Sequence, residues 1–168
     1  ALQAFHQMQV EGVMPNNVTL LNIFPACVSA IVGTLVEGIK FHAVLGHEVE
    51  SDIVLGNALV NMYGKCDQIE LAKGVFERMC GRDVVSWNAL IAAYAQQGKG
   101  KDAFHTFKQL HVEGLLPDKV TFVNVLCAFG TPDVLIYGKW IHASLHHEGL
   151  LEGNVVVGTA LANMYGKC

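Results

Sequence analysis

The feature that most constrains the fold of this chain is an internal repeat. Residues 57–66 read NALVNMYGKC and residues 159–168 read TALANMYGKC, so eight of ten positions are identical. The same spacing of 102 residues relates Gly12 to Gly114 and Pro15 to Pro117. Self-similarity at a fixed spacing is the signature of repeat architectures. The sequence therefore predicts an array of related units.

A spacing of 102 residues is too long for one supersecondary unit, so we expect it to subdivide. The pattern Gly-x-x-Pro followed by Asn or Asp occurs at 12–16 and 114–118, and Asp52 and Asp83 end the other units. These boundaries predict a single array over residues 1–168, with complete units of 36, 31, 35 and 36 residues between two partial ones: 1–16, 17–52, 53–83, 84–118, 119–154 and 155–168.

Each unit reads as two short helices. In unit 84–118, apolar residues such as Leu90, Ile91 and Tyr94 recur at helical spacing, Gly98 and Gly100 interrupt the pattern, and a second amphipathic run follows. One such hairpin cannot bury its apolar stripe alone, whereas stacked hairpins can. The prediction is an all-α fold, an α-α superhelix (helical-hairpin repeat solenoid), with the first helix of each unit on the concave face.

Composition narrows the function. The chain is 52% apolar and 15% charged, which excludes a disordered chain. Its net charge of −4 excludes a protein that relies on bulk attraction to phosphates. The five cysteines form no CxxC pair, so we expect buried thiols in a reducing compartment. No apolar run is long enough for a membrane span.

Two repeat families share a helix–turn–helix signature, and they imply different functions. Unit 84–118 partly matches the tetratricopeptide pattern through Trp87, Leu90, Tyr94, Ala103 and Phe107, which would make the chain a protein–protein scaffold. Tetratricopeptide units keep a length of about 34 residues, however. The lengths of 31, 35 and 36 residues do not fit them.

The lengths of the repeat units and their residue patterns together resemble the plant organellar pentatricopeptide-repeat family, in the subclass that alternates P, L and S motifs. Residues 84–91, VVSWNALI, look like the start of a P motif, and residues 56–66, GNALVNMYGKC, look like an S motif. Residues 120–122 and 138–143 look like parts of an L motif. The L units are 17–52 and 119–154, although both have 36 residues where about 35 is usual, so their internal register is open. Units 1–16 and 155–168 are then a partial P and a partial S motif. Since the chain begins and ends inside helical patterns, we expect it to be a segment of a longer protein.

The resemblance implies sequence-specific binding of single-stranded RNA, with one base per repeat. In that family the fifth and last residues of a P or S unit select the base. These positions hold Asn57 with Asp83 and Asn88 with Asp118, and the family's code assigns uracil to Asn with Asp. An Asn amide can donate to and accept from a pyrimidine edge, with the Asp orienting it or acting through water. We expect both pairs to face one shared trough.

Further residues have roles implied by the same resemblance. The second residues of the units, Val54, Val85 and Val156, would sandwich the bases, and Lys65 and Lys167 would contact phosphates. The partial units contribute one selecting residue each, Asn16 and Thr159, with Thr159 favouring a purine. The L units pair an apolar fifth residue with a polar last one, so we expect spacers or partner sites there: Leu21 with Asp52, and Val123 with Asn154.

Simpler structural roles compete with these assignments. Asp83 and Asp118 precede predicted helices and would serve as N-caps with or without RNA. We expect Trp87, Tyr63 and Tyr165 to be core residues. The His146-His147-Glu148 run contains the H-x-E element of zinc deaminases, but no CxxC follows. We therefore predict no metal site, no cofactor and no enzymatic activity.

The resemblance also implies a cellular setting. The parent protein would act in a mitochondrion or chloroplast, marking transcripts for C-to-U editing, with the RNA 5′ end toward its N-terminus. Small editing-factor proteins would dock on the L motifs. We expect no membrane association, and we expect that the segment can self-associate through its uncapped ends.

Overall fold

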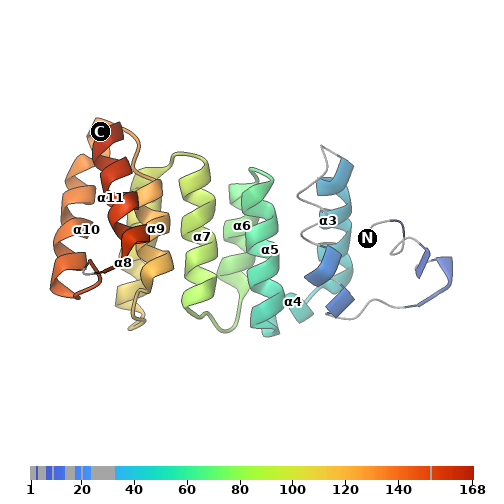
Figure 1. The fold of residues 1–168 in the computed structure, drawn as a ribbon. Coiled ribbons are helices and arrows are strands. Elements are labelled where there is room, and N and C mark those ends of the chain that lie inside the picture. Colours follow the sequence, from blue (N-terminus) through green and yellow to red (C-terminus); the bar gives the residue numbers. More distant parts are fainter. Residues whose placement is uncertain are drawn as a thin grey trace. The chain divides into compact units, whose positions relative to one another are not determined.

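The computed structural model describes residues 3, 7–8, 10–13, 18–19, 21–23, 33–151 and 153–168. These residues form helices and turns without any strand, which agrees with the predicted all-α class (Figure 1). The chain divides into two compact units, Ala1–Arg82 and Asp83–Cys168, each of which is described by itself. Within the described ranges, no helix combines the length and the apolar character that a membrane span requires.

The helices of the first compact unit are α3 (Gly33–Leu45), α4 (Glu48–Ser51), α5 (Ile53–Lys65) and α6 (Ile69–Arg78). Of these, α5 and α6 pack against each other as a helical hairpin. Asp52 starts α5, because its carboxylate accepts hydrogen bonds from the backbone N–H groups of Val54 and Leu55 at 3.0 and 3.1 Å. The helices pack closely, since a Cβ atom added at Gly56 would lie 2.8 Å from the Met79 methyl carbon. The absence of a side chain at Gly56 thus lets Met79 pack against α5.

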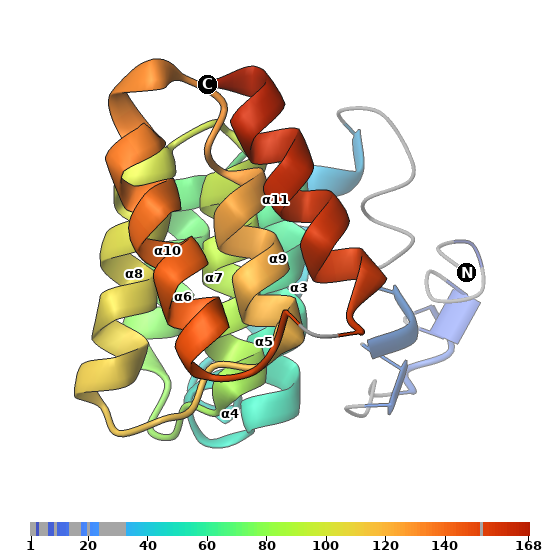
Figure 2. The same cartoon turned by 60° about the vertical axis from the view of Figure 1, so that its left-hand side comes forward.

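The second unit is a two-layered stack. Its elements are α7 (Val84–Gln96), α8 (Gly100–Val112), α9 (Lys119–Cys127), the 3-10 turn η1 (Pro132–Val134), α10 (Leu135–His147) and α11 (Val155–Lys167). Helices α7, α9 and α11 lie side by side in that order, and α8 and α10 cover the other side of this layer (Figure 2). Gly98 and Gly114 follow α7 and α8 with φ of +64° and +75°, a left-handed conformation that favours glycine.

An aromatic and aliphatic core joins the two layers of the second unit. Phe107, Phe122, Phe129, Ile141 and Leu145 have no exposed surface. This continuous core is what a single hairpin could not provide, and it fixes the separation of the first helices.

The three aromatic residues expected in the core divide into two groups. Trp87 and Tyr63 are buried, with 3% and 1% of their surface exposed. The expectation for Tyr165 is wrong, because 41% of it is exposed. Tyr63 lies on α5, which packs against α6, whereas Tyr165 lies on α11, which packs against α9 and α10.

Candidate RNA interface

The second unit brings two of the sequence-predicted selecting residues into direct contact. Asn88 lies on the second turn of α7, and its Nδ2 donates a hydrogen bond to Oδ1 of Asp118 at 3.1 Å. Asp118 is the N-cap of the neighbouring helix α9. The last residue of unit 84–118 and its fifth residue therefore meet because α7 and α9 are adjacent, although 30 positions separate them in sequence.

Asp118 is held by the first turn of α9 as well as by Asn88. Its Oδ1 accepts hydrogen bonds from the Thr121 backbone N–H at 2.8 Å and from the Thr121 hydroxyl at 2.9 Å, and its own N–H donates to that hydroxyl oxygen. This is a capping box, and Asp83 and Ser86 form the same arrangement at the start of α7. The predicted capping role of both aspartates is thus present, and in Asp118 it coincides with the contact to Asn88.

The ionised form of Asp118 is favoured by these donors. Partial desolvation acts to raise the pKa of the carboxyl group, but the hydrogen bonds from the Thr121 backbone, the Asn88 amide and the Thr121 hydroxyl outweigh it. The net result is a pKa below the usual value of 3.8. Asp118 is therefore a carboxylate at neutral pH and can only accept from Asn88.

That contact determines which atom Asn88 offers to a ligand. A rotated amide would place its oxygen against the Asp118 carboxylate, so the nitrogen must face Asp118. The Asn88 Oδ1 is then the remaining polar atom of the side chain, and it is buried with no hydrogen-bond partner among the residues that the structure describes. Leaving a buried acceptor unsatisfied costs about 1–3 kcal/mol. The site therefore favours a ligand that brings an N–H group to this oxygen.

Asn88 is deeper than the sequence predicted. Only 7% of its surface is exposed, whereas Asp118 is exposed and Val85, one turn earlier on α7, is 58% exposed. Its position between two packed helices, where it bonds Asp118, accounts for this burial. A ligand would pass the exposed valine before it reached the amide.

Two residues of the neighbouring unit support this site and were missed by the sequence reasoning. Thr121 bonds Asp118, and Asn124 Nδ2 donates to the backbone carbonyl of Asn88 at 3.3 Å. The Asp-x-x-Thr spacing of a capping box could have indicated Thr121. Nothing in the sequence indicates the Asn124 contact, which depends on how α9 lies against α7.

The second predicted pair cannot be assembled in the same way. Asn57 is half-buried on α5 in the compact unit Ala1–Arg82, whereas Asp83 begins the compact unit Asp83–Cys168. Their pairing therefore stays a prediction. Val54, also on α5, is 60% exposed, and Lys65 is exposed in the last turn of α5.

The remaining predicted residues are placed as follows. Thr159 is exposed on α11, where its hydroxyl donates to the Val155 carbonyl at 2.7 Å. Val156 is 64% exposed near the start of α11, and Lys167 is exposed in its last turn. Leu21 is half-buried, and Asn16 lies outside the described residues.

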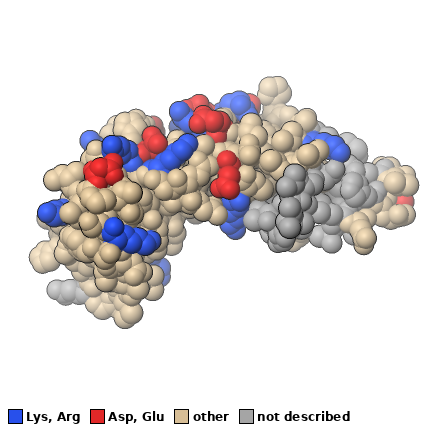
Figure 3. Space-filling view, turned by 90° about the horizontal axis from the view of Figure 1, so that it is seen from above, with Lys and Arg blue, Asp and Glu red and all other residues tan. Residues whose placement is uncertain are grey.

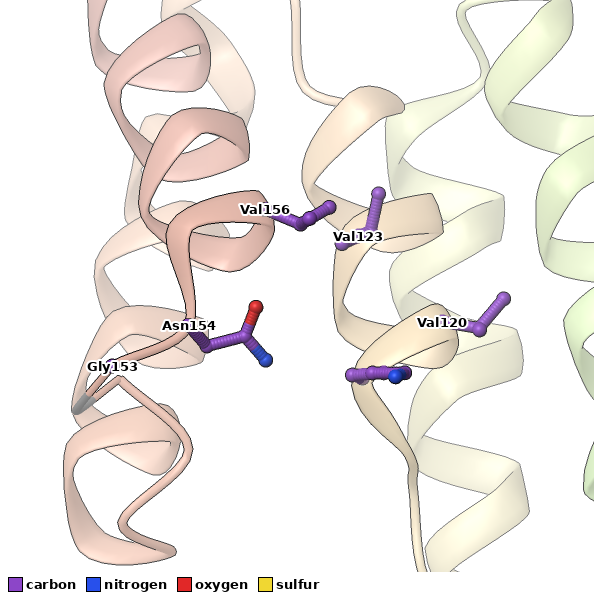
Figure 4. A pocket seen from close by; sticks show the side chains of 6 residues that line it. Val120, Val123, Gly153, Asn154 and Val156 are labelled. Carbon is purple, nitrogen blue, oxygen red and sulfur yellow. The ribbon is translucent and has the colours of Figure 1, made fainter.

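A hollow separates the first turns of α9 and α11. Its volume is about 400 Å³, and it is lined by Lys119, Val120, Val123, Gly153, Asn154 and Val156 (Figure 4). Val123 and Asn154 are the fifth and last residues of the L unit 119–154. The position that the sequence analysis assigned to a spacer or partner site is thus a concave surface with apolar walls.

Charge is distributed without a uniform basic area on the face in Figure 3, where positive side chains are interspersed with negative ones. This agrees with the net charge of −4. Binding of an anionic polymer would have to rely on individual contacts, since the protein field as a whole does not attract it.

His42 and His142, which occupy equivalent repeat positions, are each explained by a contact with a tyrosine. His42 Nδ1 lies 2.9 Å from the Tyr63 hydroxyl, and His142 Nδ1 lies 3.0 Å from the Tyr165 hydroxyl. Burial lowers the pKa of His42 and raises the pKa of Tyr63 to about 12. Across the described part of the chain, no three His, Cys, Asp or Glu side chains gather in a way that could hold a metal ion. His146 and His147 end α10.

Comparison with known proteins identifies the same repeat family that the sequence analysis indicated, with relatives that align over the whole length of the chain. Two models of the PPR repeat family match residues 82–131 and 57–84. Two pentatricopeptide repeat-containing proteins of Arabidopsis thaliana, one chloroplastic and one mitochondrial, are 35% and 37% identical to the chain over all of its length. The chain spans about a fifth of the length of these relatives, 20% and 18%.

Solved structures match as well. The pentatricopeptide repeat protein PPR10 from maize aligns with 99% of this chain at a TM-score of 0.73 and 25% identity, and the aligned part is 24% of that chain. A structure of PPR10 in complex with an 18-nt psaJ RNA element aligns with 97% of this chain at a TM-score of 0.75 and 19% identity, again over 24% of that chain. The predicted helical-repeat solenoid fold is thereby confirmed.

Proposed function

Because the chain belongs to the pentatricopeptide-repeat family, we propose that it binds single-stranded RNA and that unit 84–118 selects uracil through Asn88 and Asp118. The similarity to PPR10, which has been crystallised with an RNA element, supports the ligand class. We further propose the subclass of alternating P, L and S motifs, and reading of one base per unit.

The observation that carries the choice of base is the unsatisfied Oδ1 of Asn88. Uracil presents an N3–H group on its Watson–Crick edge, and this donor would satisfy the buried acceptor. Cytosine presents an unprotonated N3, so two acceptors would face each other. One well-formed contact of this kind discriminates by about 1–3 kcal/mol in groove readout.

The base would be held between apolar side chains before its edge is read. Val85 and Val120 occupy the second position of consecutive first helices, α7 and α9, and are 58% and 45% exposed. A base between them buries both valines against its faces. Aromatic platforms contribute about 1–3 kcal/mol per stacked base, and we expect valine to contribute less. Because the Asn88 oxygen is buried in the unbound chain, binding includes a local opening between α7 and α9.

The other predicted residues extend this arrangement along the RNA. We propose a second uracil at Asn57 and Asp83, a purine at Thr159, and phosphate contacts from Lys65 and Lys167. The RNA 5′ end lies toward the N-terminus in this proposal, which gives the order uracil, uracil, one further nucleotide, purine.

The biological setting is proposed on the relatives. Their names place them in chloroplasts and mitochondria, and we propose an organellar role for this protein in marking C-to-U editing sites. Small editing-factor proteins would dock on L motifs, on surfaces that the RNA leaves uncovered.

The test is a gel-shift titration of the 168-residue chain with short RNAs that contain U-U-C-A in an otherwise constant sequence. Replacing both uracils by cytosine should weaken binding about 10-fold or more, from the loss of the N3–H contacts. Equal affinity for the two RNAs would refute base selection at these units. Failure to bind any RNA, together with binding of peptides, would instead favour a protein–protein scaffold.

A further inference from the structure

The second helix of each L unit contacts the first helix of the following unit through one glycine and one histidine. In the compact unit Asp83–Cys168, α10 lies against α11 (Figure 2), and a Cβ atom added at Gly138 would lie 2.6 Å from the Met164 sulfur. One turn later on α10, His142 Nδ1 lies 3.0 Å from the Tyr165 hydroxyl. Gly138 thus leaves the space that Met164 fills, and the two rings meet beside it.

The same contacts recur in the compact unit Ala1–Arg82, where α3 lies against α5. A Cβ atom added at Gly38 would lie 2.6 Å from the Met62 sulfur. His42 Nδ1 lies 2.9 Å from the Tyr63 hydroxyl. The centroids of the histidine and tyrosine rings are 5.7 Å apart in both compact units. We call each set of four residues the glycine–histidine joint.

The geometry of the joint does not depend on the segment that connects its helices. His42 and Tyr63 are 21 positions apart in the sequence. His142 and Tyr165 are 23 positions apart. Helix α4 lies in the first connection, whereas the described residues between α10 and α11 form no helix. Because the contacts agree although the connections differ, the packed side chains fix how the first helix lies.

The contact of α8 with α9 is built from other residue types. Aligning residues 111–116 with 146–151 places Ala103 and Phe107 where α10 has its glycine and its histidine. Both residues are buried, and Phe107 packs on Phe122 with ring centroids 5.5 Å apart. A phenylalanine has no ring nitrogen to meet a hydroxyl group. The glycine–histidine joint therefore distinguishes the helices that follow the L units, α5 and α11, from α9.

The joint lies on the opposite side of α11 from the residues proposed to contact RNA. At roughly 100° per residue, Met164 and Tyr165 lie about 140° and 240° around the helix from Thr159. Val156 lies about 60° from Thr159, and both of these side chains are exposed. Asn57 has the same spacing to the methionine and tyrosine of α5. Contacts on the joint side therefore determine where the RNA side of each helix points.

We propose that Gly138 and His142 are positioning residues for the RNA contacts of α11. They set the rotation of this helix, so that Val156 and Thr159 face the RNA, and the glycine and histidine of α3 do the same for α5. The inference rests on the proposed RNA binding and deepens it, because it gives the L units the task of orienting the reading residues of the next unit. Such residues must be held within about 0.5 Å of their working geometry.

The test exchanges the glycine and the methionine of one joint. Gly138→Met sets a second large side chain against the buried Met164, so α11 must move to accommodate it. The preference for adenine over cytosine at the nucleotide of Thr159 should then fall by about three- to tenfold, to near unity, in gel-shift titrations. The exchange of both residues, Gly138→Met with Met164→Gly, returns the same atoms to the joint and should restore the preference in part. A preference that survives in the Gly138→Met variant would overturn the inference.

Two further measurements separate this inference from the proposed function. The response to replacement of U-U should persist in the Gly138→Met variant, because Asn88 and Asp118 belong to α7 and α9. A crystal structure of the variant needs no RNA and should show α11 rotated or shifted relative to α9. An unmoved α11 would overturn the inference even if the chain binds RNA. A displaced α11 in a chain whose unsubstituted form binds no RNA would support the joint and refute the proposed function.

The hydroxyl of the joint is tested by two matched substitutions. Tyr63→Phe should reduce the preference for the first uracil by about three- to tenfold, because Tyr63 is 1% exposed and water does not replace its contact with His42. Tyr165→Phe should reduce the adenine preference by only about two- to threefold, because 41% of Tyr165 is exposed. Unchanged base preferences in both variants would overturn the role of His142.

Discussion

The sites on α7 and α9 place equivalent residues around the same kind of gap, but one leaves a hydrogen-bond acceptor available and the other a donor. In both, a residue five places into the unit faces the N-cap of the next first helix, and exposed valines flank the gap. In unit 84–118 the cap is a carboxylate that engages the amide of Asn88 and leaves an acceptor. In unit 119–154 the fifth residue is Val123, and the cap is an amide that retains its donor. The comparison teaches that the capping residue determines the polarity of each site, either directly or by orienting its neighbour.

The largest change in base preference is expected when the fifth residue of unit 84–118 is made the same as that of unit 119–154. Asn88→Val makes the P unit resemble the L unit, deletes the acceptor and leaves a valine-lined gap. The preference for uracil over cytosine at this unit should fall from about 10-fold or more to near unity. Titration with RNAs that differ only at this nucleotide measures it. Retained preference would show that Asp118 or the backbone reads the base without Asn88.

Asp118→Asn should reverse the polarity of the same site. The amide that this substitution introduces can donate to Asn88 Oδ1, which turns the Asn88 amide nitrogen toward the base and favours the cytosine N3 acceptor. We expect a switch from uracil to cytosine of about 3- to 10-fold by gel shift. Asp102→Asn, on α8, makes the same change of charge away from the site and should leave base preference unaltered. Parallel behaviour of the two variants would attribute the effect to charge alone.

Thr121→Val should weaken the hydrogen bonding that holds Asp118 in place, while the side chains of Asn88 and Asp118 themselves stay unchanged. The valine lacks the hydroxyl that donates to Asp118, so the capping box keeps only the backbone bond. The free energy of unfolding should fall by about 0.5–1.5 kcal/mol, and the uracil preference should decline partially. Thr121→Ser restores the hydroxyl and should recover both quantities. Recovery of stability without recovery of preference would separate capping from base selection.

The smallest effect concerns acid. The pKa of Asp118 is lowered in the folded chain, so its ionised form contributes stability that is complete above the usual value of 3.8 and is lost as the pH falls through the lower folded value. The stability difference between the unsubstituted chain and Asp118→Asn should therefore stay constant from neutral pH to about 5 and diminish only in stronger acid. Denaturant unfolding at a series of pH values measures it. A difference that already changes near pH ~6 would contradict the lowered pKa.

The sequence was sufficient to predict the fold class because residues that start and end helices recur in each repeat. Aspartates before the helices and glycines after them predict short hairpins that must stack. The likeness of residues 57–66 to 159–168 could not predict exposure, because Tyr63 and Tyr165 have the same neighbours in sequence but 1% and 41% of their surfaces are exposed.

The site could be predicted only in part. Its residue types follow from the resemblance, and the contact of Asn88 with Asp118 follows from the adjacency of consecutive first helices. The orientation of the two amides depends on hydrogen bonds to Asp118 and to the Val157 N–H, which belong to the folded arrangement. For the same reason, the supporting contact from Asn124 has no local sequence signal.

The double use of the capping position restricts how such a protein can be redesigned. Asp52, Asp83, Asp118 and Asn154 each terminate a unit and each start a helix by accepting a backbone N–H bond. Only a few short oxygen-bearing side chains can do this well, namely those of Asp, Asn, Ser and Thr. If the last residue of a repeat is substituted to change the proposed base preference, about four residue types therefore preserve the start of the next helix. Any other residue would lose the cap and is expected to lower the free energy of unfolding by about 0.5–2 kcal/mol.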